Sequence, residues 1–154
     1  LDLKLHDIPN TVKAATESAG NIGADFLTIH IASGNEALDA AQEVKSNSMK
    51  ILGVSSALTS KAFTSTTSDE VLNDFLKAKE SNIDGVICPP SEISRSKELF
   101  NLIVTPGIRL KNDTNDDQKN ITTPEKAIES GADYLVMGRS IRNNIEYVVE
   151  NLTL

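Results

Sequence analysis

Residues 2–11 read Asp2-Leu3-Lys4-Leu5-His6-Asp7-Ile8-Pro9-Asn10-Thr11. The first half of this stretch predicts a β-strand over residues 1–5. Side chains at i and i+2 share one face of a strand, so Asp2 and Lys4 are expected to project together, with the three leucines packing on the opposite face. Asp7 follows in a polar turn. A lysine between two carboxylates is held in its ammonium form, which suits a general acid. A surface ion-pair cluster has the same composition, so both interpretations stay open at this point.

Short apolar runs alternate with helical patterns along the whole chain, which is typical of repeated βα units around a parallel sheet. The expected strands cover residues 1–5, 25–31, 50–55, 85–88, 102–105 and 134–138. The expected helices cover residues 11–20, 35–45, 69–81, 92–100, 124–130 and 144–151. The sequence therefore predicts about six βα units.

Local signals mark several helix ends. Thr67 with Glu70 has capping-box spacing, and Thr123 precedes a proline as an N-cap does. Gly20 and Gly131 stand where helix C-caps are expected.

Composition limits the classes of protein. The chain has 154 residues, 39% of them hydrophobic, which predicts one domain over residues 1–154. A net charge of -7 argues against nucleic acid or an anionic membrane as a partner. The single cysteine, Cys88, excludes an internal disulfide, and no apolar run approaches the ~20 residues that span a bilayer. The single cysteine also fits a reducing compartment, so the expected location is cytoplasmic.

Six units are two short of the eight that close a (β/α)8 barrel, and an open doubly wound sheet is the alternative fold. Motifs at the strand ends must distinguish between these two folds. Residues 105–109 and 138–141 follow the last two strands, where such barrels commonly bind phosphate. Gly138 lets backbone approach an anion, and Arg139 offers a planar fork to its oxygens. Each motif taken alone could be an ordinary surface turn, but together they favour phosphate.

The other polar candidates are less specific. Gln118 lies in the long polar stretch of residues 111–123 and could supply an amide donor to a bound phosphate. Residues 58–60 read Leu-Thr-Ser and could contact a polar heterocycle. His30, at a strand end, has no assigned role. The sequence has no cluster with metal-ligand spacing and no Gly-rich nucleotide loop after its first strand, which admits a reaction without metal or cofactor.

The order of these motifs resembles the orotidine 5'-phosphate decarboxylase family along essentially the whole chain. The segments that carry the resemblance are residues 2–11, 58–60, 105–109, 116–118 (Asp-Asp-Gln), 123–124 and 138–141. The resemblance implies a homodimeric (β/α)8 barrel that converts orotidine 5'-monophosphate to uridine 5'-monophosphate and carbon dioxide. It also implies that neither a metal nor an organic cofactor takes part.

The resemblance assigns chemistry to the first segment. Lys4 would donate a proton to C6 of the pyrimidine, and Asp2 would lie beside the departing carboxylate. Asp7, Ile8 and Thr11 would reach into the active site of a partner subunit, so each site would be composite.

The resemblance also assigns substrate contacts to later segments. Thr59 would contact the pyrimidine. Gln118, Gly138 and Arg139 would hold the phosphate, with Arg109 in or beside that site.

The chain also departs from the family pattern. Family members have two further βα units before residues 2–11, which carry a ribose-binding aspartate and a second active-site lysine. We therefore expect this chain to be an N-terminally truncated fragment with uncovered apolar faces, inactive by itself. Two alternatives remain: a sibling decarboxylase of keto-sugar phosphates, which typically uses magnesium, and a non-catalytic phosphate-binding fragment.

Overall fold

The computed structural model describes residues 1–58, 67–110, 121–143 and 145–151. Five parallel strands form one sheet in the order β1-β2-β3-β4-β5. The strands are β1 (Phe26–His30), β2 (Lys50–Val54), β3 (Gly85–Ile87), β4 (Ile103–Thr105) and β5 (Tyr134–Leu135). The α-helices are α1 (Pro9–Asn21), α2 (Asn35–Val44), α3 (Ser68–Glu80), α4 (Ile93–Lys97), α5 (Pro124–Glu129), α6 (Arg139–Asn143) and α7 (Ile145–Asn151). Short 3-10 helices are η1 (Ile31–Ser33), η2 (Ser56–Leu58) and η4 (Pro90–Glu92).

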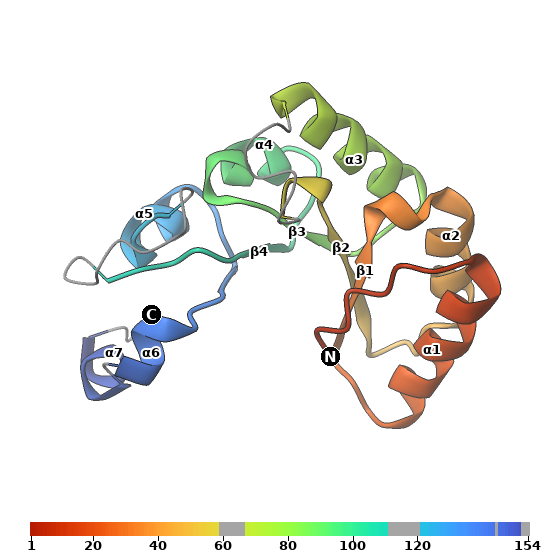
Figure 1. Ribbon diagram of the computed structural model, residues 1–154, viewed down its shortest axis with the longest axis horizontal. Helices are drawn as coiled ribbons and strands as arrows, with labels where there is room; N and C mark the ends of the chain where they lie inside the picture. The colour runs from red at the N-terminus through yellow and green to blue at the C-terminus, as the bar shows by residue number, and fades with distance from the viewer. Residues whose placement is uncertain (59–66, 111–120, 144, 152–154) are drawn as a thin grey trace.

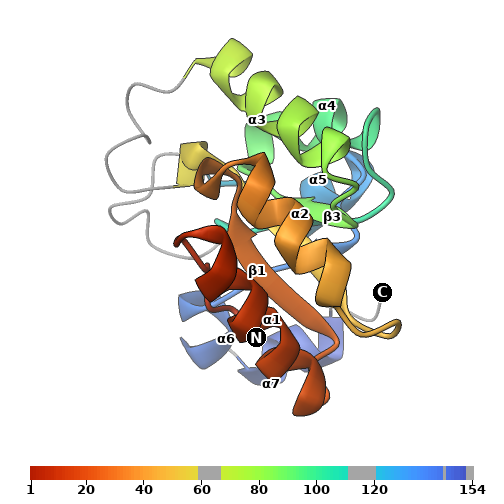
Figure 2. The same ribbon diagram turned by 90° about the vertical axis from the view of Figure 1, so that its right-hand side faces the viewer.

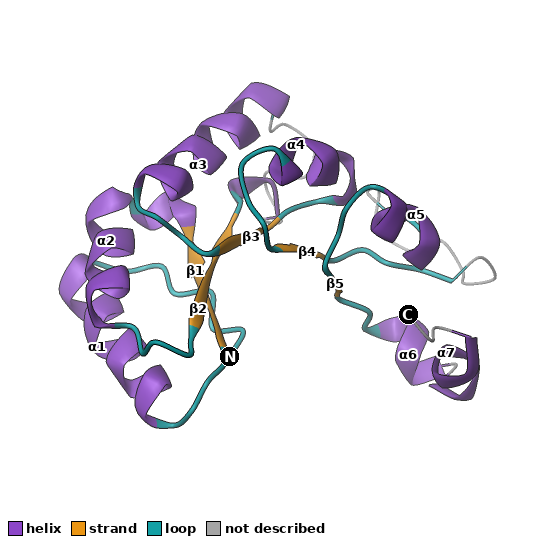
Figure 3. Ribbon diagram, turned by 180° about the vertical axis from the view of Figure 1, so that it is seen from behind, coloured by secondary structure: helices purple, strands orange, loops and turns teal. Residues whose placement is uncertain are grey.

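The sheet is curved, and helices α1 to α5 lie along its convex side (Figure 1). The concave side opens between the N-terminus and α6, as the view from behind also shows (Figure 3). Strand order that follows chain order, with a helix between successive strands, is the arrangement of a (β/α) barrel rather than of a doubly wound sheet. None of the described helices is both long enough and apolar enough to cross a bilayer.

Alternation along the strands separates two apolar clusters. Leu27 and Ile29 of β1 belong to the larger cluster, which includes the buried helix residues Leu38 and Phe75. The smaller cluster, on the opposite face of the sheet, consists of Leu52, Val54, Ile87 and Val104 from β2, β3 and β4. The convex face is therefore the main core, and the concave face carries a thin apolar layer.

Two aspartates fasten the amino ends of the strands. Asp84, just before β3, accepts hydrogen bonds from the backbone N–H of Ile51 at 2.8 Å and from Lys45 Nζ at 2.7 Å. Asp133, just before β5, accepts the N–H of Ile103 at 2.7 Å. Each carboxylate ties the start of one strand to the start of its neighbour in the chain. Figure 2 shows the molecule from the side of α1 and α2, with β1 visible between these two helices and α3 above them.

The expected strand over residues 1–5 is wrong, because only one bridge forms there. Leu5 pairs with Ile29 of β1 in parallel, and the backbone N–H of His30 donates to the Leu5 carbonyl at 2.8 Å. Lys4 has a left-handed φ of 49°. Its N–H donates to the side chain of Thr28 instead of a backbone carbonyl, so the ladder is interrupted.

The expected leucine packing face is also corrected. Leu1 is 47% exposed and Leu3 is 54% exposed, and only Leu5 packs against the main core. The sheet consequently has five strands rather than six. Tyr134 in β5 and Val136 after it are likewise exposed.

Several helix ends differ from the expected ones. Helix α1 begins at Pro9, because proline suits the first helical position, and it continues past Gly20. The left-handed residue after α1 is Gly23, with a φ of 78°. Gly131, with a φ of 105°, confirms the expected break after α5.

The start signals of two helices are confirmed. Thr67 and Glu70 form the reciprocal capping box of α3. The Thr123 side chain accepts the backbone N–H of Lys126 at the start of α5.

One expected helix is divided, and one helix was not expected. The helix expected over residues 92–100 is η4 followed by α4, since Pro90 starts a turn early and Glu98 N–H bonds three residues back, to Arg95. The helix expected over residues 144–151 is found as α7, and the short helix α6 before it was not predicted.

Candidate active site

A cavity of about 540 Å³ lies on the concave face of the sheet. Its walls come from the first residues of the chain, from all five strands and from the segment that follows β4. The lining residues are Leu1, Asp2, Lys4, Phe26, Thr28, Leu52, Val54, Leu58, Ile87, Pro90, Val104, Pro106, Gly107, Tyr134, Leu135 and Val136. The cavity is largely apolar, with the charged residues Asp2 and Lys4 at one side.

Asp2 and Lys4 form a pair that β1 holds in place. Lys4 Nζ lies 2.5 Å from Asp2 Oδ2. Thr28 Oγ1 donates to Asp2 Oδ1 at 3.0 Å and accepts the backbone N–H of Lys4 at 2.7 Å. Thr28 is only 4% exposed, so one buried hydroxyl fixes the Asp2 carboxylate and the Lys4 backbone, and Asp2 in turn holds the Lys4 ammonium. Sequence reasoning missed Thr28, although the polar residues Thr28 and His30 alternate with Leu27 and Ile29 in β1.

The surroundings of Asp2 keep it ionised. Partial burial by itself raises the pKa of Asp2. The hydrogen bonds from Lys4 and Thr28 and the charge of Lys4 outweigh that effect and lower the pKa below its ordinary value. An anion and an ammonium group are therefore fixed together at the cavity wall. Such a pair can donate a proton and stabilise negative charge that forms nearby.

His30 lies close to this pair, at the carboxyl end of β1. Its ring centroid is 5.2 Å from that of His6. His30 Nδ1 is buried and has no hydrogen-bond partner among the residues that the structure describes. Burial, followed by the charges of His6 and Lys4, lowers the pKa of His30, so the ring is neutral at pH 7.

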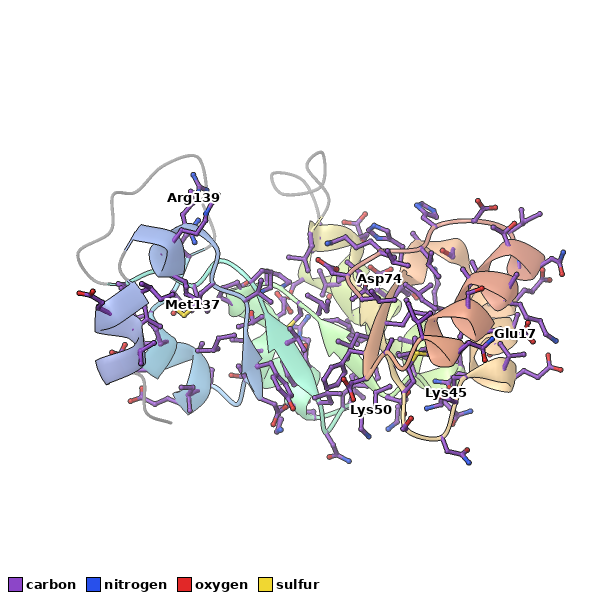
Figure 4. The ribbon with its side chains drawn as sticks, turned by 90° about the horizontal axis from the view of Figure 1, so that it is seen from below. Glu17, Lys45, Lys50, Asp74, Met137 and Arg139 are labelled. Atoms are coloured by element: carbon purple, nitrogen blue, oxygen red, sulfur yellow. The ribbon has the colours of Figure 1, made fainter. Side chains whose placement is uncertain are left out.

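The two segments expected to bind phosphate meet after β4 and β5. Ser140, in the first turn of α6, donates from Oγ to the carbonyl of Ile108 at 3.4 Å. Gly107 has a left-handed φ of 79°, which explains why glycine follows Pro106. Lys45 and Lys50 lie at the amino end of β2, and Arg139 lies toward the other end of the strands (Figure 4). Arg139 is therefore at the carboxyl ends of the strands.

Arg109 is placed by backbone pairing. Its N–H donates to the carbonyl of Thr122 at 3.0 Å, and the N–H of Thr122 donates to the carbonyl of Gly107 at 3.2 Å. Arg109 is half-buried, and its Nη1 donates to the carbonyl of Ile108. Backbone pairing thus joins Thr122 to the first candidate phosphate segment, residues 105–109.

The three residues expected to serve a partner subunit lie outside the cavity. Asp7, Ile8 and Thr11 are exposed at the start of α1, and Ile8 is 65% exposed. The described lining of the cavity includes none of them. Within one chain, the structure does not bring them together with Asp2 and Lys4.

Two predicted site residues, Thr59 and Gln118, lie outside the described residues. Leu58, the residue before Thr59, lines the cavity. In the described part of the chain, no three His, Cys, Asp or Glu side chains are grouped as metal ligands.

The sequence pattern of the orotidine 5'-phosphate decarboxylase / HUMPS family matches residues 1–150. The chain belongs to this family. A curated relative named orotidine 5'-phosphate decarboxylase, from Streptococcus gordonii, is 41% identical over an alignment of 154 residues that covers 92% of this chain. A relative of the same name from Bacillus cereus strain Q1 is 39% identical over 159 residues. The chain spans 66% of the length of the first relative and 67% of the second.

Comparison with solved structures agrees with this family assignment. The crystal structure of orotidine 5'-phosphate decarboxylase from Lactobacillus acidophilus matches this chain with a TM-score of 0.74 and 28% identity. The match covers 100% of this chain and 75% of that structure. The expected fold, part of a (β/α)8 barrel, is confirmed.

Proposed function

We propose that the protein is an orotidine 5'-phosphate decarboxylase, which converts orotidine 5'-monophosphate to uridine 5'-monophosphate and carbon dioxide. The observation that carries the proposal is the Asp2–Lys4 pair at the cavity wall, oriented by the Thr28 hydroxyl. Membership of the family and relatives of that name support it.

In the proposed reaction, the bond between C6 and the substrate carboxylate breaks and carbon dioxide leaves. The electron pair stays at C6, where the Lys4 ammonium stabilises it and then donates a proton. Asp2, held anionic, lies beside the departing carboxylate and favours its loss by repulsion. Because Thr28 fixes the Asp2 carboxylate, and Asp2 holds the Lys4 ammonium, little reorganisation is required as charge develops.

We propose that the phosphate binds at the carboxyl ends of β4 and β5, where Gly138, Arg139 and Gln118 contact it and Arg109 lies in or beside the site. The hydrogen bond between Ser140 and Ile108 supports this placement, since it joins the two segments. Thr59 would contact the pyrimidine. Phosphate is remote from the reacting carbon, so its binding energy can be used to organise the site.

We further propose a homodimer in which Asp7, Ile8 and Thr11 enter the partner's cavity. Their exposure at the start of α1, outside their own chain's cavity, supports this arrangement. We also propose a cytoplasmic location, because a sequence with a single cysteine carries no internal disulfide.

The test is the Lys4→Ala variant of the chain supplied with the part of its Streptococcus relative outside the match, measured for turnover and for affinity toward a barbiturate ribonucleotide. We expect turnover to fall by several orders of magnitude and affinity to fall far less, because the ammonium acts mainly on charge that forms during the reaction. Lys13→Ala is the matched control, since Lys13 pairs with Glu43 on the outer helices. Equal losses of turnover and affinity in Lys4→Ala would contradict the assigned role. Absence of both ligand binding and carbon dioxide release in the unsubstituted, supplemented chain would contradict the function.

A sibling decarboxylase of keto-sugar phosphates is the second candidate, because Asp2, Lys4 and Asp7 have the spacing that both activities share. Activity on such a substrate that disappears with a chelator would favour it.

The third candidate is a non-catalytic phosphate-binding fragment, since the chain spans under two thirds of its Streptococcus relative. We expect the 154-residue chain to lack turnover by itself. We expect turnover to return when the part of that relative outside the match is supplied.

A further inference from the structure

Asp74 in α3 is a buried carboxylate whose hydrogen bonds all point to one place. It is 8% exposed. Its Oδ2 accepts the backbone N–H of Ser56 at 2.9 Å, the Ser56 hydroxyl at 2.6 Å and the Ser55 hydroxyl at 3.4 Å. A single oxygen thus ties α3 to the two residues that directly follow β2.

These donors lie at the cavity end of β2. Ser56 begins the turn η2, and the last residue of that turn, Leu58, lines the same cavity as Asp2 and Lys4. The Leu58 wall therefore depends on a turn whose first N–H is held by Asp74. At the amino end of β2, Asp84 accepts the N–H of Ile51 in a similar way, but there the strand starts rather than ends.

The end of β2 at which each carboxylate lies indicates its role. In barrels of this kind, side chains at the carboxyl ends of strands serve the reaction, and those at the amino ends serve stability. We propose that Asp74 is a positioning residue that holds η2 where Leu58 forms the wall around the pyrimidine end of a bound nucleotide. This inference rests on the proposed function.

Loss of the Asp74 acceptor would leave the Ser56 N–H and two hydroxyls to find other partners, so η2 would shift. The base end of the cavity would then fit a pyrimidine less well. Phosphate contacts come from the segments after β4 and β5, which Asp74 does not touch in the described structure. Loss of the Asp74 acceptor should therefore weaken binding of ligands that carry a pyrimidine and not of ligands that lack one.

The experiment measures the affinity of the protein for uridine 5'-monophosphate and for ribose 5-phosphate by calorimetry. Asp74→Ala should weaken binding of the nucleotide by about tenfold and change binding of the sugar phosphate by less than about twofold. Asp74→Asn should lose less nucleotide affinity than Asp74→Ala, because the two lone pairs of an amide oxygen can still accept the two shorter hydrogen bonds, from the Ser56 N–H and the Ser56 hydroxyl. Asp84→Ala is the matched control: it should lower the unfolding temperature and leave both affinities unchanged.

Should Asp74→Ala fail to fold, Ser56→Ala removes one donor and keeps the backbone N–H. Ser56→Ala should weaken binding of uridine 5'-monophosphate by less than Asp74→Ala does, and should again leave binding of ribose 5-phosphate nearly unchanged. Equal losses for both ligands, or no loss for the nucleotide, would overturn the positioning role. An unsubstituted protein that does not bind uridine 5'-monophosphate would instead overturn the proposed function.

Discussion

Thr28 and Asp2, which lie 26 positions apart in the sequence, are joined by a hydrogen bond of 3.0 Å from Oγ1 to Oδ1. The same hydroxyl accepts the backbone N–H of Lys4, so β1 fixes both charged residues from one point. The Asp2–Lys4 pair is therefore built on the sheet, although the segment that carries it forms only one bridge to that sheet.

Thr28→Val removes the hydroxyl and nearly preserves the shape of the side chain. In the chain supplied with the part of its Streptococcus relative outside the match, we expect turnover to fall about tenfold or more with little change in nucleotide affinity. The free energy of unfolding of the chain should fall by about 1 kcal/mol. The pKa of Asp2 should rise, because a hydrogen bond to its ionised form is lost. Steady-state kinetics and a carboxyl titration by NMR check these outcomes. Thr28→Ser should restore them, and a valine variant with normal turnover would show that the hydroxyl is dispensable.

Arg139→Ala tests the phosphate end of the site. We expect at least a tenfold loss of affinity for both uridine 5'-monophosphate and ribose 5-phosphate, because a charge-assisted contact to the shared phosphate disappears. Arg142→Ala, an exposed arginine of the same short helix, is the control and should stay within about twofold. A loss for the nucleotide alone, measured by calorimetry, would place Arg139 away from the phosphate.

Asp84→Ala tests the fastening at the amino ends of the strands. The variant leaves the Ile51 N–H and the Lys45 ammonium without their acceptor, so the free energy of unfolding should fall by about 1–3 kcal/mol. Urea denaturation measures this change. Asp39→Ala, at an exposed position of α2, should change stability by less than about 0.5 kcal/mol. A neutral Asp84 variant would mean that the carboxylate adds nothing beyond the backbone ladder.

His30 should make stability depend on pH. Its pKa is lowered in the folded state from about 6.5 in the unfolded chain, so between the two values the unfolded chain binds more protons. Stability therefore falls as the pH drops from about 6.5 toward the folded-state pKa of His30, and changes little for this reason above 6.5. Urea midpoints measured across this range should show the slope, and His30→Asn should flatten it.

His6→Asn gives the complementary result. It removes one of the nearby positive charges, so the pKa of His30 should rise and its NMR titration should move to higher pH. An unchanged titration of His30 would mean that the 5.2 Å ring contact carries no electrostatic coupling.

Local features were predictable from the sequence. Asp2 and Lys4 meet because they are two residues apart, and the capping box of Thr67 and Glu70 spans a single turn. The five strands also appear close to their expected positions, since buried parallel strands read as short apolar runs. The Leu1–Leu5 prediction failed because an apolar pattern does not report whether each residue finds a backbone partner.

Only the tertiary structure decided what the functional side chains touch. The contacts of Thr28 with Asp2, of Asp74 with Ser56, and of Ser140 with Ile108 join residues 26, 18 and 32 positions apart. The sequence alone determined the βα rhythm and the charged pair in residues 2–11, because both depend on neighbours along the chain. The distant contacts depend on strand register and on how each helix packs on the sheet, and these are set by burial of the whole core rather than by any one segment.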